Sequence, residues 1–380
     1  MVAGPCETGP FAASRPATIV PETPATCPPG TAGHRPASGQ ALEDWEIERL
    51  DENSLTLDIA QVRRGDEPFG APTPVIATQQ VLNAEAYDGP LTLRYSFLSD
   101  LDAEDGRQVR LVLEHPERCT ITVNGTPITY TGLPYWRDIR WLPIDISALV
   151  RRGENIVDLG YPEFRYGDAT SVADQARRYG TEIEAIYVIG DFSVSAQPAH
   201  DLTVVEPSEP TPPWPLEAIQ GPFVIGAPGR LSPGDLVWQG LPFYAGRIAC
   251  RTTVTLAARP AGPVWIETDR LSVPVVGVRV NGQDVGALAW RPYRVEITAA
   301  LRTGENTIEL MLYHSLRNLL GPHHNGQGEP QSVGPASFRA TGTDWAGRRL
   351  RQYTASWRPS YGVMEFGLLG GVRLVGAAHP

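Results

Sequence analysis

Lysine is absent from all 380 residues of this chain, so its 32 basic side chains are all arginines. Without lysine the chain cannot form a nucleotide-binding phosphate loop of the Walker type, a pyridoxal Schiff base or a serine–lysine catalytic pair. The 43 acidic side chains give a net charge of −11, and no basic stripe is visible. We therefore expect no nucleic-acid partner, because such partners attract basic surfaces.

Cysteine is scarce and long hydrophobic runs are missing. Cys6, Cys27, Cys119 and Cys250 form no C-x-x-C pair and show no zinc spacing. No segment approaches the roughly 20 apolar residues of a membrane span. The start also lacks the charged and apolar regions of a secretory signal. These features predict no membrane partner and no metal site, and they leave the localisation unknown, with the cytoplasm as the default.

Turn-forming residues and alternating hydrophobic residues are abundant. Glycine occurs 38 times and proline 36 times, and hydrophobic residues make up 42% of the chain. From Trp45 onward, segments such as "SLTLDIAQVRR" and "RQVRLVLEH" alternate with a period of two, which is typical of half-buried antiparallel strands. No segment shows a long period of 3.6 residues. The chain is therefore predicted to be all-β.

A sequence repeat divides the chain into two copies. "ITVNGTPIT" (121–129) and "VRVNGQDVG" (278–286) both read as a strand that reverses at Asn-Gly, a strong hairpin signal. Each is followed by Trp-Arg-x-x-Arg, by a hydrophobic–acid–Ile triplet and by Gly-Glu-Asn (153–155 and 304–306). The same features in the same order predict one fold built twice, as two tandem β-sandwiches of jelly-roll type.

The repeat also predicts where each part of the chain begins and ends. Residues 1–42 are rich in Ala, Pro, Gly and Thr without periodicity, which indicates a disordered leader. The first sandwich is expected over 43–200 and the second over 216–377. The proline-rich segment 201–215 is expected to join them as a semi-rigid linker.

The Trp-Arg segment of each copy is the main candidate for a binding site. Sugars bind through an aromatic face for their C–H groups and planar polar groups for their hydroxyls. The alternative is that each tryptophan caps its sandwich and each arginine pairs with an acid. The duplicated acids Asp145 and Glu296 are more simply explained by a solvent-facing strand position than by catalysis. The candidate carbohydrate-binding residues are Trp136, Arg137, Arg140, Trp290, Tyr293 and Arg294.

Two adjacent histidines form a second candidate. His323 and His324 lie in "LGPHHNGQGEP" (320–330), with His314 nearby. Neighbouring side chains in a strand point to opposite faces, which argues against their binding one metal ion. A structural or interface role, a ligand contact and a metal site all remain open, in that order of preference.

The second copy carries a family resemblance. "GLPFYAGRIACRTTVTL" followed by "VRVNGQDVGALAWRPYRVEITAALRTGENTIEL" resembles the galactose-binding-like jelly rolls of family 2 glycoside hydrolases. It is still more similar to C-terminal modules of large bacterial glycosidases, including α-L-rhamnosidase relatives, in which a similar strand leads into "LRNLLGPHH". The first copy, with "HPERCTITVNG", resembles the module before that tail. The resemblance covers about 43–377.

This resemblance implies a role without deciding the chemistry. Such modules are accessory parts of hydrolases whose separate catalytic domain lies upstream, and many of these relatives are secreted. The resemblance implies a non-catalytic region that binds carbohydrate or docks onto a catalytic domain that is separate or lost. The alternatives are a glycoside hydrolase and a structural adhesion module, so whether the chain is an enzyme stays open. We expect no cofactor. The resemblance suggests a structural calcium ion, although no acid-rich calcium loop is visible.

Overall fold

The computed structural model describes residues 39–168, 174, 178–200, 216–324 and 358–376. Strands dominate this part of the chain, and the predicted all-β sandwich fold is confirmed. The assignment of each sandwich to a particular jelly-roll type stays a prediction. The expected linker and residues 1–38 of the expected leader lie outside the described residues. Short 3₁₀ helices are η1 (Ala103–Asp105), η2 (Pro116–Arg118), η3 (Ser147–Leu149), η4 (Val237–Gln239) and η5 (Thr298–Ala300).

The first half of the chain forms two sheets that share a hydrophobic core. Its strands are β3 (Asn53–Leu57), β4 (Ile59–Arg64), β5 (Thr73–Pro74), β6 (Asp88–Ser99), β7 (Val109–Glu114), β8 (Thr120–Val123), β9 (Thr126–Ile128), β10 (Trp141–Asp145), β11 (Gly153–Arg165), β12 (Ile186–Gly190) and β13 (Ser193–Pro198). One sheet has the order β3-β12-β7-β10, and the other contains β4-β6-β11-β8-β9. Buried residues such as Leu111 and Val188 from the first sheet and Leu93 and Val157 from the second belong to one core.

The second half repeats this arrangement. Its strands are β14 (Leu216–Gly226), β15 (Gly234–Asp235), β16 (Arg247–Leu256), β17 (Val264–Thr268), β18 (Val275–Val280), β19 (Gln283–Leu288), β20 (Arg294–Glu296), β21 (Gly304–Tyr313), β22 (Tyr361–Met364), β23 (Gly367–Leu368) and β24 (Val372–Gly376). Two of them extend the larger sheet of the first half, since β14 pairs with β13 and β6, and β22 pairs with β14. β15 and β23 pair with each other in a separate small sheet. Two further strands come from the start of the described chain, namely β1 (Gln40–Leu42) and β2 (Glu46–Arg49).

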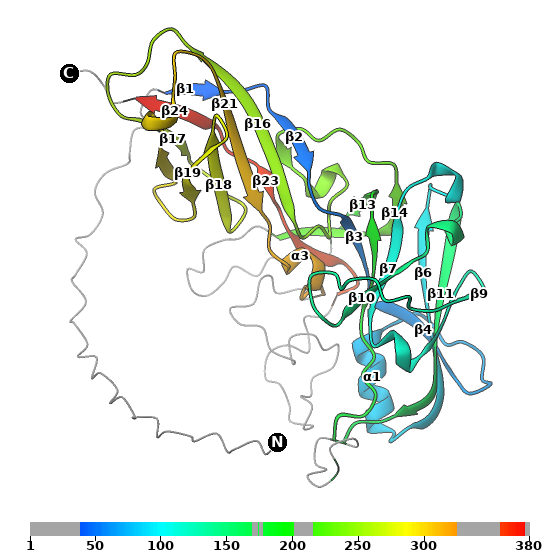
Figure 1. Ribbon diagram of the computed structural model, residues 1–380. Coiled ribbons are helices and arrows are strands. Elements are labelled where there is room, and N and C mark those ends of the chain that lie inside the picture. Colours follow the sequence, from blue (N-terminus) through cyan, green and yellow to red (C-terminus); the bar gives the residue numbers. More distant parts are fainter. Residues whose placement is uncertain (1–38, 169–173, 175–177, 201–215, 325–357, 377–380) are drawn as a thin grey trace, which may run out of the picture. The chain divides into compact units, whose positions relative to one another are not determined.

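These first two strands pair with strands of the second half. β1 is antiparallel to β24, and β2 is antiparallel to β16. The second sheets therefore read β1-β24-β17-β20 and β2-β16-β21-β18-β19, which matches the first pair position by position. Figure 1 shows β2 running from beside β16 directly into β3. β2 thus lies within 43–200 in the sequence, whereas its hydrogen bonds are to the second sandwich.

A duplicated asparagine lock explains why the repeat keeps both Asn-Gly and Gly-Glu-Asn. In the second copy Asn281 has φ of 53°, and its Nδ2 donates to the Ala300 carbonyl and to Asn306 Oδ1, both at 2.9 Å. Asn306, fully buried, also accepts from the Arg302 amide and donates to the Arg302 and Gly304 carbonyls. The turn residues therefore hold the hairpin to the strand that follows it.

The first copy makes the same contacts. Asn124 has φ of 51° and donates to the Leu149 carbonyl and to Asn155 Oδ1 at 2.8 and 2.9 Å. Asn155 bonds to the Arg151 amide and carbonyl and to the Gly153 carbonyl. The duplication predicted from sequence thus extends to individual side-chain hydrogen bonds.

Three polar side chains of β3 join the two halves. Asn53 donates to the Gly240 carbonyl at 2.8 Å, Ser54 Oγ to the Phe243 carbonyl at 2.6 Å, and Thr56 Oγ1 to the Leu319 carbonyl at 2.9 Å. All three are buried. The polar residues of "NSLTL" therefore face carbonyls of the second half, whereas Leu55 and Leu57 enter the core.

Helices are few and short. Those whose bounds lie within the described residues are α1 (Val75–Ala84) and α3 (Arg317–Leu320), and no described helix is long and apolar enough to cross a membrane. α1 has no counterpart in the sequence analysis, because Thr78 and Gln79 are among its four buried positions. The buried positions have helical spacing, but half of them are polar. The buried Gln79 side chain keeps hydrogen-bond partners, since it accepts from the Ile183 amide at 2.8 Å and donates to Asn83.

Candidate functional site

The first Trp-Arg segment is used for packing. Trp136 is only 8% exposed and stacks on Trp141 with ring centroids 5.7 Å apart, beside Tyr187. Leu319 of α3 completes this cluster from the second half. The ring of Trp136 therefore covers the outer face of the β3-β12-β7-β10 sheet and presents little surface to a ligand.

The two arginines of this segment have different neighbours. Arg137 has φ of 59° and its Cζ is 4.9 Å from the centroid of the Trp136 ring. The pKa of Arg137 is lowered by exclusion of solvent, although Asp51 partly offsets this. Arg140 is exposed and offsets part of the rise in the pKa of Glu184, which reaches about 7 through burial and the charges of Glu114 and Glu182.

The second Trp-Arg segment faces solvent. Trp290, between β19 and β20, is 81% exposed. Arg291 lies 5.9 Å from the centroid of the half-buried Tyr293 ring, and Arg294 lies 5.8 Å from that of Trp265. In the described part of the chain, neither arginine side chain has an ion-pair partner. β17 and the segment leading into β20 thus carry the aromatic rings of Trp265, Trp290 and Tyr293 and two guanidinium groups without ion-pair partners among the described residues, and we call these residues the Trp290 surface.

Trp265 is the member of this surface that the sequence analysis missed. It lies on β17 opposite Glu296, and Glu267 lies opposite Arg294. Ile266 between them is fully buried, so Trp265 and Glu267 share the outer face. The alternation in "VWIET" carried this signal, but a tryptophan next to a buried isoleucine is equally typical of a core.

The two acidic residues of this surface have different partners. Glu296 accepts from Thr298 Oγ1 at 2.9 Å, as Asp145 accepts from Ser147 in the first copy, and each contact begins a 3₁₀ turn. Glu267 lies 3.7 Å from Arg373. The surface therefore offers acceptors beside the free donors of Arg291 and Arg294, which suits a ligand rich in hydroxyl groups.

The adjacent histidines lie between the two halves, and the structure separates their roles. His324 Nε2 is 3.0 Å from Asp58 Oδ2, and its Nδ1 is 2.8 Å from the Arg358 carbonyl. A carbonyl only accepts, so Nδ1 carries a proton. Tyr361 donates to the other oxygen of Asp58 at 2.6 Å. Burial opposes both charges, but mutual hydrogen bonding and attraction leave the pKa of His324 raised and that of Asp58 lowered.

His323 behaves in the opposite way. It is 5% exposed, packs edge-on against Phe243 with centroids 5.6 Å apart, and has its pKa lowered to about 4 by burial. Among the described residues, no group of three or more His, Cys, Asp or Glu side chains could hold a metal ion. The two neighbours therefore form one charged pair and one neutral packing contact.

Comparisons with known proteins give a coarse result. No protein family model matches the chain, and no curated protein sequence matches it. Among solved structures, a rhamnosidase from Novosphingobium sp. PP1Y is 19% identical over 75% of this chain and 21% of its own, with a TM-score of 0.25. A β-D-glucuronidase from Dictyoglomus thermophilum is 13% identical over 66% of this chain and 38% of its own, with a TM-score of 0.27.

A third match is similar in extent. A glycosyl hydrolase family 2 member from Bacteroides cellulosilyticus DSM 14838 is 14% identical over 70% of this chain and 32% of its own, with a TM-score of 0.25. The chain therefore resembles, distantly, parts of glycoside hydrolases, and it spans well under half the length of these proteins. At such scores the matches carry no argument about activity.

Proposed function

We propose that this chain is a non-catalytic accessory region of a glycoside hydrolase and binds carbohydrate at the Trp290 surface. The observation that supports it is the exposed ring of Trp290, in the same short segment as Arg291 and Arg294, which have no ion-pair partners among the described residues. Removing a large apolar side chain from water contributes about 1.5–3 kcal/mol. Because folding leaves the Trp290 ring exposed, a sugar ring placed on it would gain binding free energy from this burial. Arg291, Arg294 and Glu267 would then bind the hydroxyl groups.

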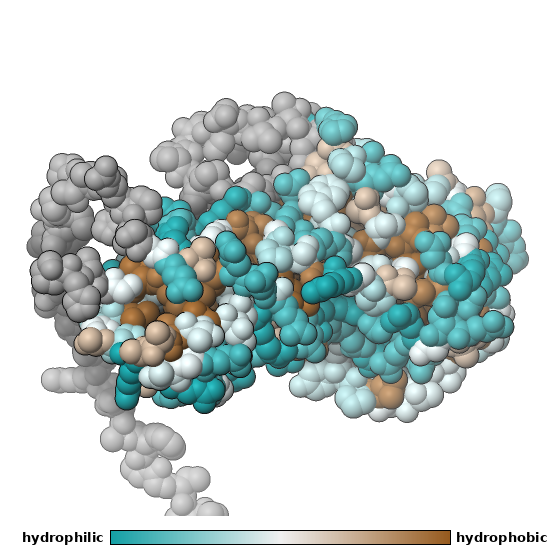
Figure 2. All heavy atoms as spheres, turned by 90° about the horizontal axis from the view of Figure 1, so that it is seen from above, coloured by the Kyte–Doolittle hydropathy of each residue, from teal (hydrophilic) through white to brown (hydrophobic). Residues whose placement is uncertain are grey.

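The proposal applies to the second copy only. Trp136 is already covered by Trp141, and its buried cluster includes Leu319 of the second half, so the equivalent position in the first copy belongs to the contact between the halves instead. Docking onto a catalytic domain is the competing role for an accessory region. On the face that Figure 2 shows, hydrophobic atoms lie in several groups separated by hydrophilic ones. A permanent partner usually covers a broader apolar area.

Replacing Trp290 by alanine tests the proposal. A glycan array would first identify the sugar, and calorimetry with that sugar would then compare variants of the full chain. We expect W290A to weaken binding at least about tenfold, because about 1.4 kcal/mol corresponds to a factor of ten. W238A is the matched control, since Trp238 is also exposed but lies in η4, and it should bind normally. Equal binding by both variants would refute the assignment.

A hydrolase remains the alternative, and one group makes it testable. The Glu184 side chain is exposed, but partial desolvation and the charges of Glu114 and Glu182 raise its pKa to about 7, which suits a proton donor. Aryl glycosides, including rhamnosides, would be assayed with the full chain and with E184Q. Turnover that disappears in E184Q would replace the accessory role by catalysis. The same absence of turnover in both proteins, together with sugar binding, is the expected result.

A further inference from the structure

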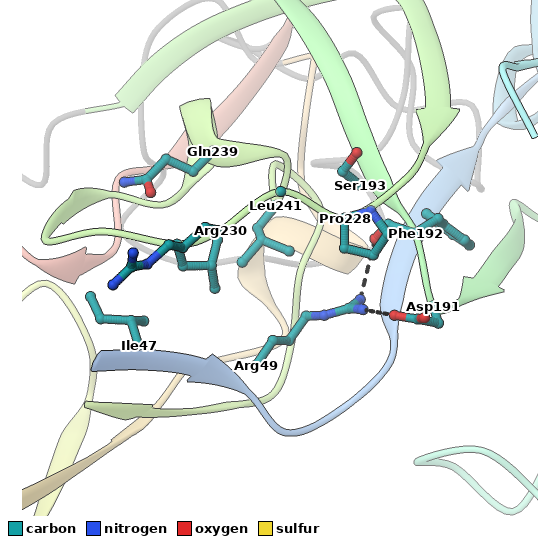
Figure 3. Close-up of a pocket in the computed structure, with 11 residues that line it drawn as sticks. Ile47, Arg49, Asp191, Phe192, Ser193, Pro228, Arg230, Gln239 and Leu241 are labelled. Atoms are coloured by element: carbon teal, nitrogen blue, oxygen red, sulfur yellow. Dashed lines mark hydrogen bonds and ion pairs between the residues drawn. The ribbon is translucent and has the colours of Figure 1, made fainter. Parts of the chain in front are cut away.

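A pocket of about 240 Å³ lies where β2 meets the turn between β12 and β13 and the segment 228–241 (Figure 3). It is separate from the Trp290 surface and shares no residue with it. Its walls come from three parts of the sequence. The lining residues are Ile47, Arg49, Asp191, Phe192, Ser193, Pro228, Gly229, Arg230, Leu231, Gln239 and Leu241.

Positive charge exceeds negative charge around this pocket. Arg49 donates to Asp191 Oδ1 at 2.7 Å and to the Gly190 and Phe192 carbonyls at 3.3 Å. The other oxygen of Asp191 accepts from Arg107 at 2.6 Å. One carboxylate is therefore already shared by two guanidinium groups, which leaves no negative charge in the lining for a third.

That third group is Arg230. Its side chain is exposed, and among the described residues it has no hydrogen-bond or ion-pair partner. Figure 3 shows it extending toward Ile47 and away from the Arg49–Asp191 pair. Glu48 of β2 lies between the pocket residues Ile47 and Arg49 in the sequence, so its side chain is on the other face of the strand. There it pairs with Arg251 at 2.7 Å. Arg230 is thus an uncompensated cation in a chain whose net charge is −11.

The uncharged polar groups of the lining are already engaged. The Gln239 amide accepts from the Ser232 amide at 2.8 Å and donates to the Ser232 and Asp235 carbonyls. Ser193 Oγ donates to the Ala227 carbonyl at 3.0 Å. A neutral, hydroxyl-rich ligand would find few donors here. The remaining lining is apolar and includes Ile47, Pro228 and Leu241.

We propose that this pocket binds a small carboxylate with an apolar body, its anionic end paired with Arg230 and its body against Ile47, Pro228 and Leu241. Guanidinium and carboxylate form strong, charge-assisted hydrogen bonds. A volume of about 240 Å³ is below the range for drug-sized ligands, so the ligand is compact. The proposal does not depend on sugar binding at the Trp290 surface.

Ligand-observed NMR titration of the full chain tests the proposal, with sodium benzoate as the probe and benzyl alcohol as the neutral probe of the same size. We expect saturable, weak binding of benzoate and at least about tenfold weaker binding of benzyl alcohol, because the alcohol cannot form a charge-assisted hydrogen bond with the Arg230 guanidinium. R230Q should weaken benzoate binding by a similar factor. Inorganic phosphate, which lacks the apolar body, should compete poorly.

R259Q is the matched control, because Arg259 is also exposed and unpaired among the described residues but lies outside the pocket. It should bind benzoate as the unmodified chain does. Equal affinity for benzoate and benzyl alcohol, equal effects of R230Q and R259Q, or no saturable binding would each overturn the proposal. Phosphate binding as tight as that of benzoate would contradict the apolar part of it.

Discussion

Replacing Asn306 by alanine is expected to destabilise the protein by about 3–4 kcal/mol. The side chain is fully buried and links the Asn281 turn to the backbone of Arg302 and Gly304. Alanine would leave several of these donors and acceptors buried without partners, and each such group costs about 1–3 kcal/mol. Urea unfolding followed by tryptophan fluorescence would measure the loss.

The repeat supplies an internal comparison for this result. Asn155 makes the same contacts in the first copy, so N155A should cost a similar amount. T307A is the control, because Thr307 adjoins Asn306 but its side chain is exposed, and its effect should stay within about 0.5 kcal/mol. If N306A proved as mild as T307A, the lock would not stabilise the sandwich.

Replacing Asp58 by asparagine is expected to cost about 3–5 kcal/mol near pH 6, because it leaves the charge of His324 buried without its partner. The effect should depend on pH. The pKa of His324 is raised above 6.5, so its contribution is complete below that value and is lost as the pH rises through the raised pKa. The pKa of Asp58 is lowered from 3.8, so its contribution is lost only in acid, as the pH falls through the lowered pKa. The cost of D58N should therefore shrink at alkaline pH.

Other charged and titratable groups near the Asp58–His324 pair also affect the stability and its pH dependence. His323 has its pKa lowered to about 4, so it destabilises the fold as the pH falls below 6.5, and Arg317 acts on it in the same direction. Asp58 raises the pKa of His323, so D58N changes this contribution in acid, and the comparison is made from pH 6 upward, well above the pKa of His323. Y361F, which removes only one hydrogen bond to Asp58, should cost about 1 kcal/mol.

D66N is the control for the Asp58 prediction, since Asp66 is exposed and has no ion-pair partner in the described part of the chain. Its unfolding free energy should match that of the unmodified chain throughout the pH range. A cost of D58N that stayed constant from pH 6 to alkaline pH would show that His324 is neutral in the folded state.

Local sequence patterns predicted much of the fold, whereas contacts between residues far apart in the sequence were not predicted. The Asn-Gly turn at 281–282 and the triplet Gly304-Glu305-Asn306 predicted the duplication, because turn chemistry is written in adjacent residues. The pairing of β1 with β24 and of β2 with β16 was not predictable, since strand partners far apart in sequence leave no local signal. α1 was missed because Gln79 and Thr78 occupy its buried face.

The same distinction between local and non-local information applies to the candidate site. Sequence identified Trp136 and Trp290 as equivalent, and the structure shows that one is buried and the other exposed. Exposure depends on which distant segments pack around a ring, here the cluster of Trp136 that includes Tyr187 and Leu319, and no pattern around either tryptophan reveals those segments. Trp290 as a binding residue stays a prediction, and the pair formed by Asp58 and His324 came from the structure alone.

The path of β1 and β2 has a consequence for how the protein is made. During synthesis residues 40–49 lack their partners while most strands of the first sandwich are already made, because β16 and β24 emerge much later. Two short unpaired strands must therefore wait in solution, and such edges invite association with other chains. Glu46 and Glu48 on β2 place negative charge on that waiting segment, and charged edge residues are a known protection against such pairing. A fragment starting at residue 216 would lack this closing pair of strands and would leave the edges of β16 and β24 permanently open.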